Sequence, residues 1–152
     1  MIYLGADHAG FELKEEIKKY LQKNGFEVED MGAFALNPDD DYPDFVRPAA
    51  EAVALRWTQG KDDTLGIVLG GSGQGEAIAA NKINGIRAVV YYGGPIDIVK
   101  LSRQHNNANI LALGARFLSK NEALEAVKVW LETPFEGGRH ERRLKKIEDL
   151  EA

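Results

Sequence analysis

The chain has 152 residues with 19 Lys and Arg, 24 Asp and Glu, and no cysteine. The lack of cysteine excludes disulfides, Cys-ligated metal clusters and a thiolate nucleophile, and the net charge of −5 gives no overall attraction to nucleic acid or anionic membranes. No apolar run reaches the ~20 residues of a membrane span, and the first ten residues lack the pattern of a signal peptide. We therefore expect one compact cytoplasmic domain that binds neither nucleic acid nor membrane.

Short apolar segments alternate with longer amphipathic segments along the whole chain. Strands are predicted at residues 2–6, 26–31, 65–69, 88–91 and 110–113. Helices are predicted around residues 13–21, 46–57, 76–82, 96–103, 123–131 and 139–150. Ser119 and Glu122 form a capping box ahead of the fifth helix. The alternation predicts an α/β fold: a three-layer α/β/α sandwich, Rossmann-like, with a doubly wound parallel sheet of five strands in the order 2-1-3-4-5.

Two polar loops follow the first and third predicted strands. Residues 7–10 read Asp-His-Ala-Gly, and residues 70–76 read Gly-Gly-Ser-Gly-Gln-Gly-Glu. In the predicted order the sheet reverses direction between these strands, and ligands bind beyond the carboxyl ends of strands at such a point. We therefore expect the two loops to face each other across one crevice.

The glycine-rich loop at 70–75 leaves backbone N–H groups uncovered at the start of a helix, a geometry suited to an anion or a developing oxyanion. Its spacing matches neither the dinucleotide nor the P-loop pattern, so a tight strand-to-helix turn is the alternative. Glu76 follows in the first turn of the helix. It is either a carboxylate stabilised by the helix dipole or, if burial or the nearby Asp7 raises its pKa, a general base.

Three other polar segments are ambiguous by themselves. His8 could simply bond a backbone carbonyl, and the Asn- and His-rich segment 101–109 could simply end a helix. Near the carboxyl end, five Lys and Arg fall within the eight residues 139–146. Arg139 and Arg143 lie four residues apart, where two guanidinium groups can grip a phosphate, although a solvated helix face is the alternative. Because no aromatic residues are interleaved, a small phosphorylated ligand is a better candidate than nucleic acid.

These segments, in this order, resemble the type B ribose-5-phosphate isomerase family and its relatives that act on hexose 6-phosphates. The matching motifs are residues 5–10 with Lys14, 41–44, 71–76 with 79–82, 102–107, 114–116, and 137–140 with Arg143. The resemblance implies that residues 1–152 form one sugar-phosphate isomerase domain. It also implies an aldose–ketose isomerase that needs no metal or cofactor and interconverts ribose 5-phosphate and ribulose 5-phosphate through an enediolate.

The resemblance assigns roles to individual residues. One branch of the family takes the C2 proton with a cysteine at the end of the third strand, where this chain has Gly70, and the other branch uses a glutamate six residues later, which is Glu76. His105 would open the furanose ring. The other implied substrate-binding residues are Asp7 at a sugar hydroxyl, Tyr42 and Asn106 beside the sugar, Gly71, Ser72, Gly73, Gln74 and Gly75 at the enediolate oxygens, and His8, Arg116, Arg139 and Arg143 at the phosphate.

The predicted topology separates these residues. His105 and Asn106 precede the fifth strand, whereas Glu76 follows the third, and a strand of ~5 residues separates the two edges of a sheet by roughly 17 Å. We therefore expect a homodimer, or a dimer of dimers, whose active sites are shared between subunits, as the family also implies. The predicted C-terminal helix, 139–150, has an apolar stripe that packs either on the partner or on its own subunit.

One segment departs from the family pattern. Residues 91–97 read Tyr-Tyr-Gly-Gly-Pro-Ile-Asp, a longer and less polar loop than the resemblance implies, so a hexose 6-phosphate such as allose 6-phosphate is the alternative substrate. A non-catalytic phosphate- or flavin-binding α/β module is the alternative from another class. A receiver domain needs an aspartate after the third strand, and a flavodoxin-like protein needs a hydroxyl-rich loop after the first, whereas this chain has neither.

Overall fold

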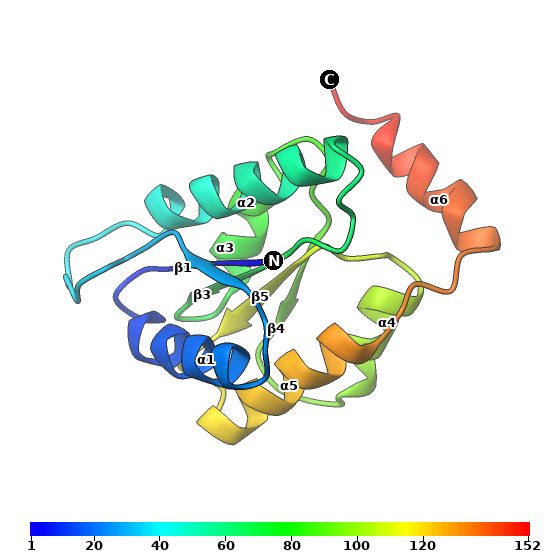
Figure 1. The fold of residues 1–152 in the computed structure, drawn as a ribbon. Coiled ribbons are helices and arrows are strands. Elements are labelled where there is room, and N and C mark those ends of the chain that lie inside the picture. Colours follow the sequence, from blue (N-terminus) through cyan, green and yellow to red (C-terminus); the bar gives the residue numbers. More distant parts are fainter.

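The computed structural model describes residues 1–152, in which a parallel sheet lies between two layers of helices (Figure 1). The strands are β1 (Ile2–Ala6), β2 (Val28–Asp30), β3 (Leu65–Gly70), β4 (Ala88–Tyr91) and β5 (Ile110–Gly114). The helices are α1 (Phe11–Lys23), α2 (Pro43–Thr58), α3 (Gln74–Ala80), α4 (Asp97–Gln104), α5 (Lys120–Glu132) and α6 (Arg139–Glu148). The predicted α/β class and its three layers are confirmed. None of the helices has the length and apolar character that crossing a bilayer requires.

The predicted strand order is wrong in its last two strands, because the sheet runs β2-β1-β3-β5-β4. β5 pairs with β3 from Gly66↔Ile110 to Gly70↔Gly114, and β4 pairs only with β5. The physical reason is burial. Every residue of β5 is buried, whereas three of the four β4 residues are only partly buried, so the more apolar strand takes the inner position and β4 the edge. The sheet still changes direction between β1 and β3, as predicted.

Alternate residues of the central strands build two cores, one on each face of the sheet. On one face Ile67 and Leu69 pack with α1, α4 and α5, and the indole of Trp130 is fully buried there. On the other face Val68 and Ala112 pack with α2 and α3. Because both faces are covered, β3 is apolar without alternation, as its sequence predicts.

Element ends differ from the predictions by a few residues. β2 is shorter than predicted because it is an edge strand, with Phe26 exposed ahead of it. α3 begins two residues early, at Gln74, because Gly73 adopts a left-handed conformation with φ +78° and serves as the N-cap. The capping box of α5 is confirmed by bonds from Glu122 N to Ser119 Oγ (3.1 Å) and from Ser119 N to Glu122 Oε1 (3.0 Å).

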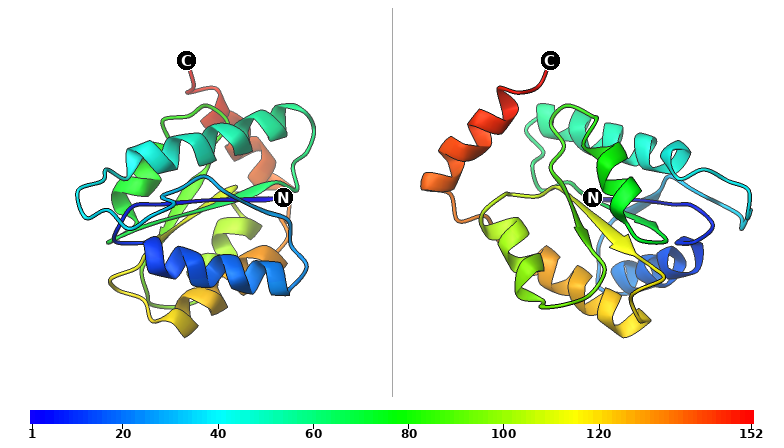
Figure 2. Two further views of the ribbon diagram at one scale, coloured as in Figure 1. Left: turned by 60° about the vertical axis from the view of Figure 1, so that its left-hand side comes forward. Right: turned by 180° about the vertical axis from the view of Figure 1, so that it is seen from behind.

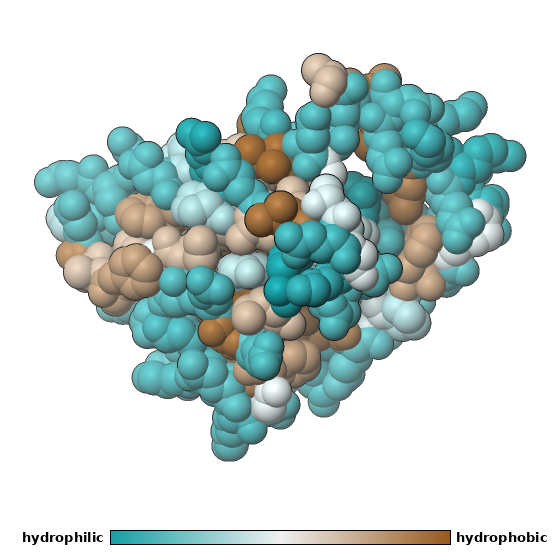
Figure 3. All heavy atoms as spheres, turned by 45° about the horizontal axis from the view of Figure 1, so that its top comes forward, coloured by the Kyte–Doolittle hydropathy of each residue, from teal (hydrophilic) through white to brown (hydrophobic).

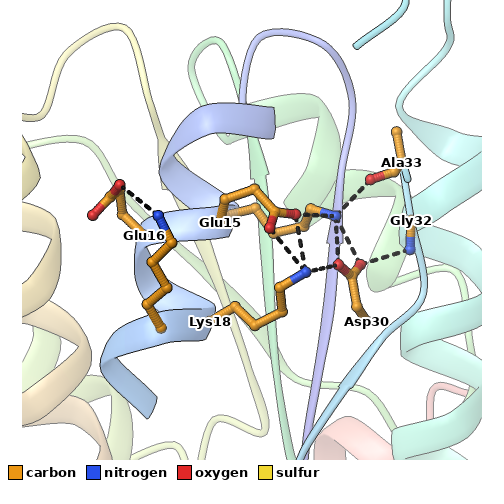
Figure 4. Close-up of polar contacts among 8 residues, drawn as sticks. Glu15, Glu16, Lys18, Asp30, Gly32 and Ala33 are labelled. Atoms are coloured by element: carbon orange, nitrogen blue, oxygen red, sulfur yellow. Dashed lines mark hydrogen bonds and ion pairs between the residues drawn. The ribbon is translucent and has the colours of Figure 1, made fainter. Parts of the chain in front are cut away.

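A buried lysine ties α1 to the end of β2 (Figure 4). The Lys14 side chain is fully buried, and its Nζ donates to both carboxylate oxygens of Asp30 at 2.7 and 2.8 Å and to the carbonyl of Ala33 at 2.6 Å. Asp30 also accepts from Lys18 Nζ (2.8 Å) and from Gly32 N (2.9 Å). These bonds fix the start of the long loop at 31–42, which leads into α2.

Replacing Lys14 by methionine is expected to lower the free energy of unfolding by about 3–5 kcal/mol, since it leaves Asp30 without its buried partner. Urea denaturation measures this change. The control is Lys19→Met, because Lys19 is 72% exposed and pairs with Glu16 only at 3.5 Å, and it should cost less than ~1 kcal/mol. Equal losses in the two variants would contradict a structural role for the buried ion pair.

α6 stands apart from the three layers. The views in Figures 1 and 2 show it joined to α5 by an extended segment and lying on the opposite side of the molecule from the loop at 31–42. Its Leu144 is buried on its own subunit, whereas Ile147 and Leu150 are 45% and 84% exposed. The apolar stripe of this helix is therefore only partly used within the single chain.

Candidate active site

A pocket of about 430 Å³ lies beyond the carboxyl ends of β1 and β3. Its lining includes Asp7, His8, Tyr42, Gly71, Ser72, Gly75, Glu76 and Arg116. The two polar loops therefore meet across one crevice, as the topology predicts. Gly73 and Gln74 belong to the same loop but do not line the pocket.

Glu76 is buried, with 3% of its surface exposed, and its carboxyl group lies directly over Gly70. A Cβ added to Gly70 would overlap this carboxyl group. The space that a cysteine side chain would use at position 70 is therefore filled by the Glu76 carboxylate. With Glu76 in this position, residue 70 has no room for a side chain, so glycine at 70 is what allows the carboxyl group to lie there.

Burial raises the pKa of Glu76, and the charge of Asp7 raises it further. Hydrogen bonds from the backbone N–H groups of Glu76 and Gly73 oppose this shift, but the net direction is upward. The helix N-terminus and the buried environment therefore act on this pKa in opposite directions, and burial has the larger effect. A carboxylate with a raised pKa, facing a pocket, has the properties of a general base.

The glycines of this loop allow close approach of two larger side chains. A Cβ on Gly75 would overlap the Tyr42 hydroxyl, and a Cβ on Gly71 would meet Arg116 Nη1 at 3.1 Å. Tyr42 comes from the start of α2, and Arg116 follows β5. The loop thus brings a ring and a guanidinium group against its own backbone N–H groups.

On the facing loop, Asp7 and His8 are both held by hydrogen bonds. Asp7 Oδ1 accepts from Ala9 N (2.9 Å) and Gly10 N (3.2 Å). His8 donates from its backbone N to Asp40 Oδ1 at 2.9 Å, and its Nδ1 lies 2.7 Å from the same oxygen. Sequence reasoning missed Asp40. Three aspartates in succession carry no local sign of which one faces inward.

A second group of predicted residues lies at the other edge of the sheet. His105 ends α4, and Asn106 follows it, ahead of β5. The His105 ring stacks on His140, with ring centroids 4.2 Å apart and 15° between the planes. Burial lowers the pKa of His140, and so do the charges of His105, Arg139 and Arg143. Neither these arginines nor His105 and Asn106 line the pocket that holds Glu76.

Two clusters carry enough carboxylate and imidazole groups to be considered as metal sites: His105, Glu136 and His140, and Asp7, His8 and Asp40. In the first, the nearly parallel rings direct their nitrogens along parallel planes rather than toward one point. In the second, Asp40 Oδ1 already accepts two bonds from His8. In each cluster, two of the three groups are therefore already in contact with each other.

A family model described as Ribose/Galactose Isomerase matches residues 2–147. The chain belongs to this family. Ribose-5-phosphate isomerase B of Mycolicibacterium paratuberculosis is 43% identical over 99% of this chain and 91% of that protein. The solved structure of ribose-5-phosphate isomerase B from Mycoplasma genitalium with bound ribulose-5-phosphate has a TM-score of 0.90 and 38% identity, covering 97% of this chain and 93% of that chain.

The enzyme from Clostridium thermocellum gives a TM-score of 0.88 at 45% identity, over 98% of this chain and 95% of that chain. Membership of an isomerase family argues against the phosphate- or flavin-binding module as an alternative. The family match also spans both groups of site residues, from Asp7 to Arg143.

Proposed function

We propose that the protein interconverts D-ribose 5-phosphate and D-ribulose 5-phosphate. The observation that carries this proposal is Glu76, a buried carboxylate with a raised pKa that faces a polar pocket lined by the glycine-rich loop. The family match and the relative that binds ribulose-5-phosphate support it. Because phosphorylated sugars are metabolised inside the cell, we also propose a cytoplasmic location.

In the proposed mechanism, Glu76 takes the proton from C2 of the open-chain aldose, and negative charge develops on the oxygens of the resulting enediolate. A proton passes from the C2 oxygen to the C1 oxygen, and Glu76 returns its own proton to C1, which leaves the C2 carbonyl of the ketose. We assign the stabilisation of the negative charge to the N–H groups of residues 71–75 and to the Ser72 hydroxyl, because Gly71, Ser72 and Gly75 line the pocket. Asp7 accepts a hydrogen bond from a sugar hydroxyl, and Tyr42 flanks the sugar.

The phosphate and the ring-opening step need the second group of residues. His8 and Arg116 bind the phosphate from the pocket itself, whereas Arg139 and Arg143 lie near His105 at the other edge of the sheet. β3 has six residues, and a strand rises about 3.3 Å per residue. His105, which opens the furanose ring, and Asn106 are therefore too far from Glu76 of the same chain.

We propose that a partner subunit supplies this second group, in a homodimer or a dimer of dimers. Large apolar side chains are exposed on several helices, among them Ile78 on α3, Ile98 and Leu101 on α4, and Ile147 on α6. Hydrophobic patches interrupt the mostly hydrophilic face in Figure 3. Leu144 and His140 pack on their own subunit, whereas the other residues of α6, Arg139 and Arg143 among them, are exposed and can contact the partner.

The choice between a pentose and a hexose depends on the pocket wall. Tyr92 packs edge to face on Phe117, with ring centroids 6.2 Å apart, and Phe117 lines the pocket. The segment that departs from the family pattern therefore contacts a pocket residue. A hexose 6-phosphate such as allose 6-phosphate is therefore the alternative substrate to be tested.

Purified protein is expected to convert ribose 5-phosphate to ribulose 5-phosphate in the presence of a metal chelator, with the same rate as without it. The ketose is measured directly, and allose 6-phosphate is tested in parallel. A higher kcat/KM for allose 6-phosphate would reassign the substrate. No turnover of either sugar would contradict the proposed function.

A further inference from the structure

The half-buried His8 is tied to a single carboxylate oxygen. Its backbone N and its Nδ1 both bond Asp40 Oδ1, at 2.9 and 2.7 Å. The Asp40 side chain is only 7% exposed, and its other oxygen, Oδ2, is buried without a hydrogen-bond partner. Burying a carboxylate oxygen without a partner costs free energy, so this arrangement needs an explanation beyond stability.

The loop at 31–42 delivers Asp40 to this position. Its start is fixed by the bond from Lys14 to the Ala33 carbonyl, and its end by Tyr42, which lies against Gly75. Between these points Asp40 N donates to the Asn37 carbonyl at 3.1 Å. Both neighbouring aspartates are exposed, whereas the middle one of the three turns inward and bonds His8.

This pairing decides which nitrogen of His8 remains for a ligand. A carboxylate only accepts hydrogen bonds, so Nδ1 carries a proton and donates it to Asp40. Nε2 is then the free ring nitrogen, on a side chain that is 29% exposed and lines the pocket.

The surrounding charges favour the protonated ring. The hydrogen bond that His8 donates to Asp40 raises the pKa of His8, and the charges of Asp7 and Asp40 raise it further. Burial and the charge of Arg116 oppose the shift, but the net direction is upward. A protonated ring offers Nε2–H as a charge-assisted donor to an anion.

We propose that Asp40 is a positioning residue: it holds His8 in the orientation and protonation that present Nε2–H to the phosphate of the substrate. This inference rests on the proposed function, because it takes His8 as a phosphate ligand. Asp40 acts through His8 and does not itself touch the sugar. The Asp40 carboxylate keeps the His8 ring in one orientation and keeps the proton on it, whereas a histidine in an open loop has neither constraint.

The first test follows His8 by NMR in the free protein, with its ring signal assigned by comparison with His8→Gln. In Asp40→Asn, which keeps an acceptor oxygen in place, we expect the His8 pKa to fall below that of wild type, because the charged acceptor is lost. Asp39→Asn is the matched control, because Asp39 is exposed, and it should leave the titration unchanged. An identical His8 titration in wild type and Asp40→Asn would overturn the proposal.

The second test measures kinetics with ribose 5-phosphate. Asp40→Asn should raise KM about tenfold, with kcat changed by less than about twofold, because ground-state and transition-state binding of the phosphate are lost together. In the His8→Gln background the same change should have no further effect on KM. Additive effects of the two substitutions would overturn the proposal.

The two readouts separate the inference from the function on which it rests. If wild-type protein turned over no sugar while the His8 titration still shifted in Asp40→Asn, the proposed function would fail and the pairing would stand. If sugars were turned over and neither the titration nor KM changed, Asp40 would have no positioning role.

Discussion

Replacing Glu76 by glutamine is expected to lower kcat by about 10²–10⁴-fold, the range that a positioned general base contributes. Glutamine has nearly the same shape and can accept the backbone N–H bonds of the loop, but it cannot take a proton. The variant should also fail to exchange the C2 hydrogen of the sugar with deuterium from the solvent, which NMR detects. Exchange at the wild-type rate in Glu76→Gln would contradict the assignment of the base.

Ionisation of Glu76 has separate effects on folding stability and on catalysis, and both depend on pH. The pKa of Glu76 is raised in the folded state above the 4.5 of an unperturbed glutamate, so the folded protein binds this proton more tightly than the unfolded chain. Stability from this group is therefore present below pH 4.5 and is lost as the pH rises through the folded pKa. At neutral pH, Glu76→Gln should be at least as stable as wild type. The control is Glu125→Gln, an exposed carboxylate on α5.

Because activity needs the ionised form, the acid limb of the wild-type kcat profile should lie at a higher pH than the pKa of an exposed glutamate.

A heterodimer of Glu76→Gln and His105→Ala subunits is expected to recover about half of the wild-type activity per dimer, since one of its two shared sites is then intact. Each parent homodimer is strongly impaired, because every site lacks either the base or the ring-opening histidine. Two different affinity tags on co-expressed subunits isolate the heterodimer, and ribose 5-phosphate turnover is then measured.

The matched control places both substitutions on one chain and pairs it with wild type. In a shared-site dimer, each of the two sites then lacks one residue, and this heterodimer should be as impaired as the parents. If each site lay within one subunit, the results would be reversed: the first heterodimer would show no recovery and the second would retain half the activity. An active monomer in light scattering would also contradict the shared site.

Much of the fold could be predicted because the relevant signals are local. The alternation of apolar and amphipathic segments depends on side chains within a few residues of one another, so the α/β class, β1 and the α5 capping box follow from it. The strand order does not follow from these local signals. Placing β5 inside and β4 at the edge depends on how deeply each strand is buried by elements far away in the sequence.

For the candidate site, too, some features follow from the sequence and others only from the tertiary structure. The sequence by itself determined which residue types are present: it holds no cysteine and has Gly70 at the end of β3, and with the family resemblance this led to the proposal that Glu76 is the base. Only the tertiary structure decided that the carboxyl group of Glu76 is buried over Gly70, and that Asp40 rather than its neighbours pairs with His8. The physical reason is that burial and ion pairing arise when distant segments meet, and a pKa depends on those surroundings more than on adjacent residues.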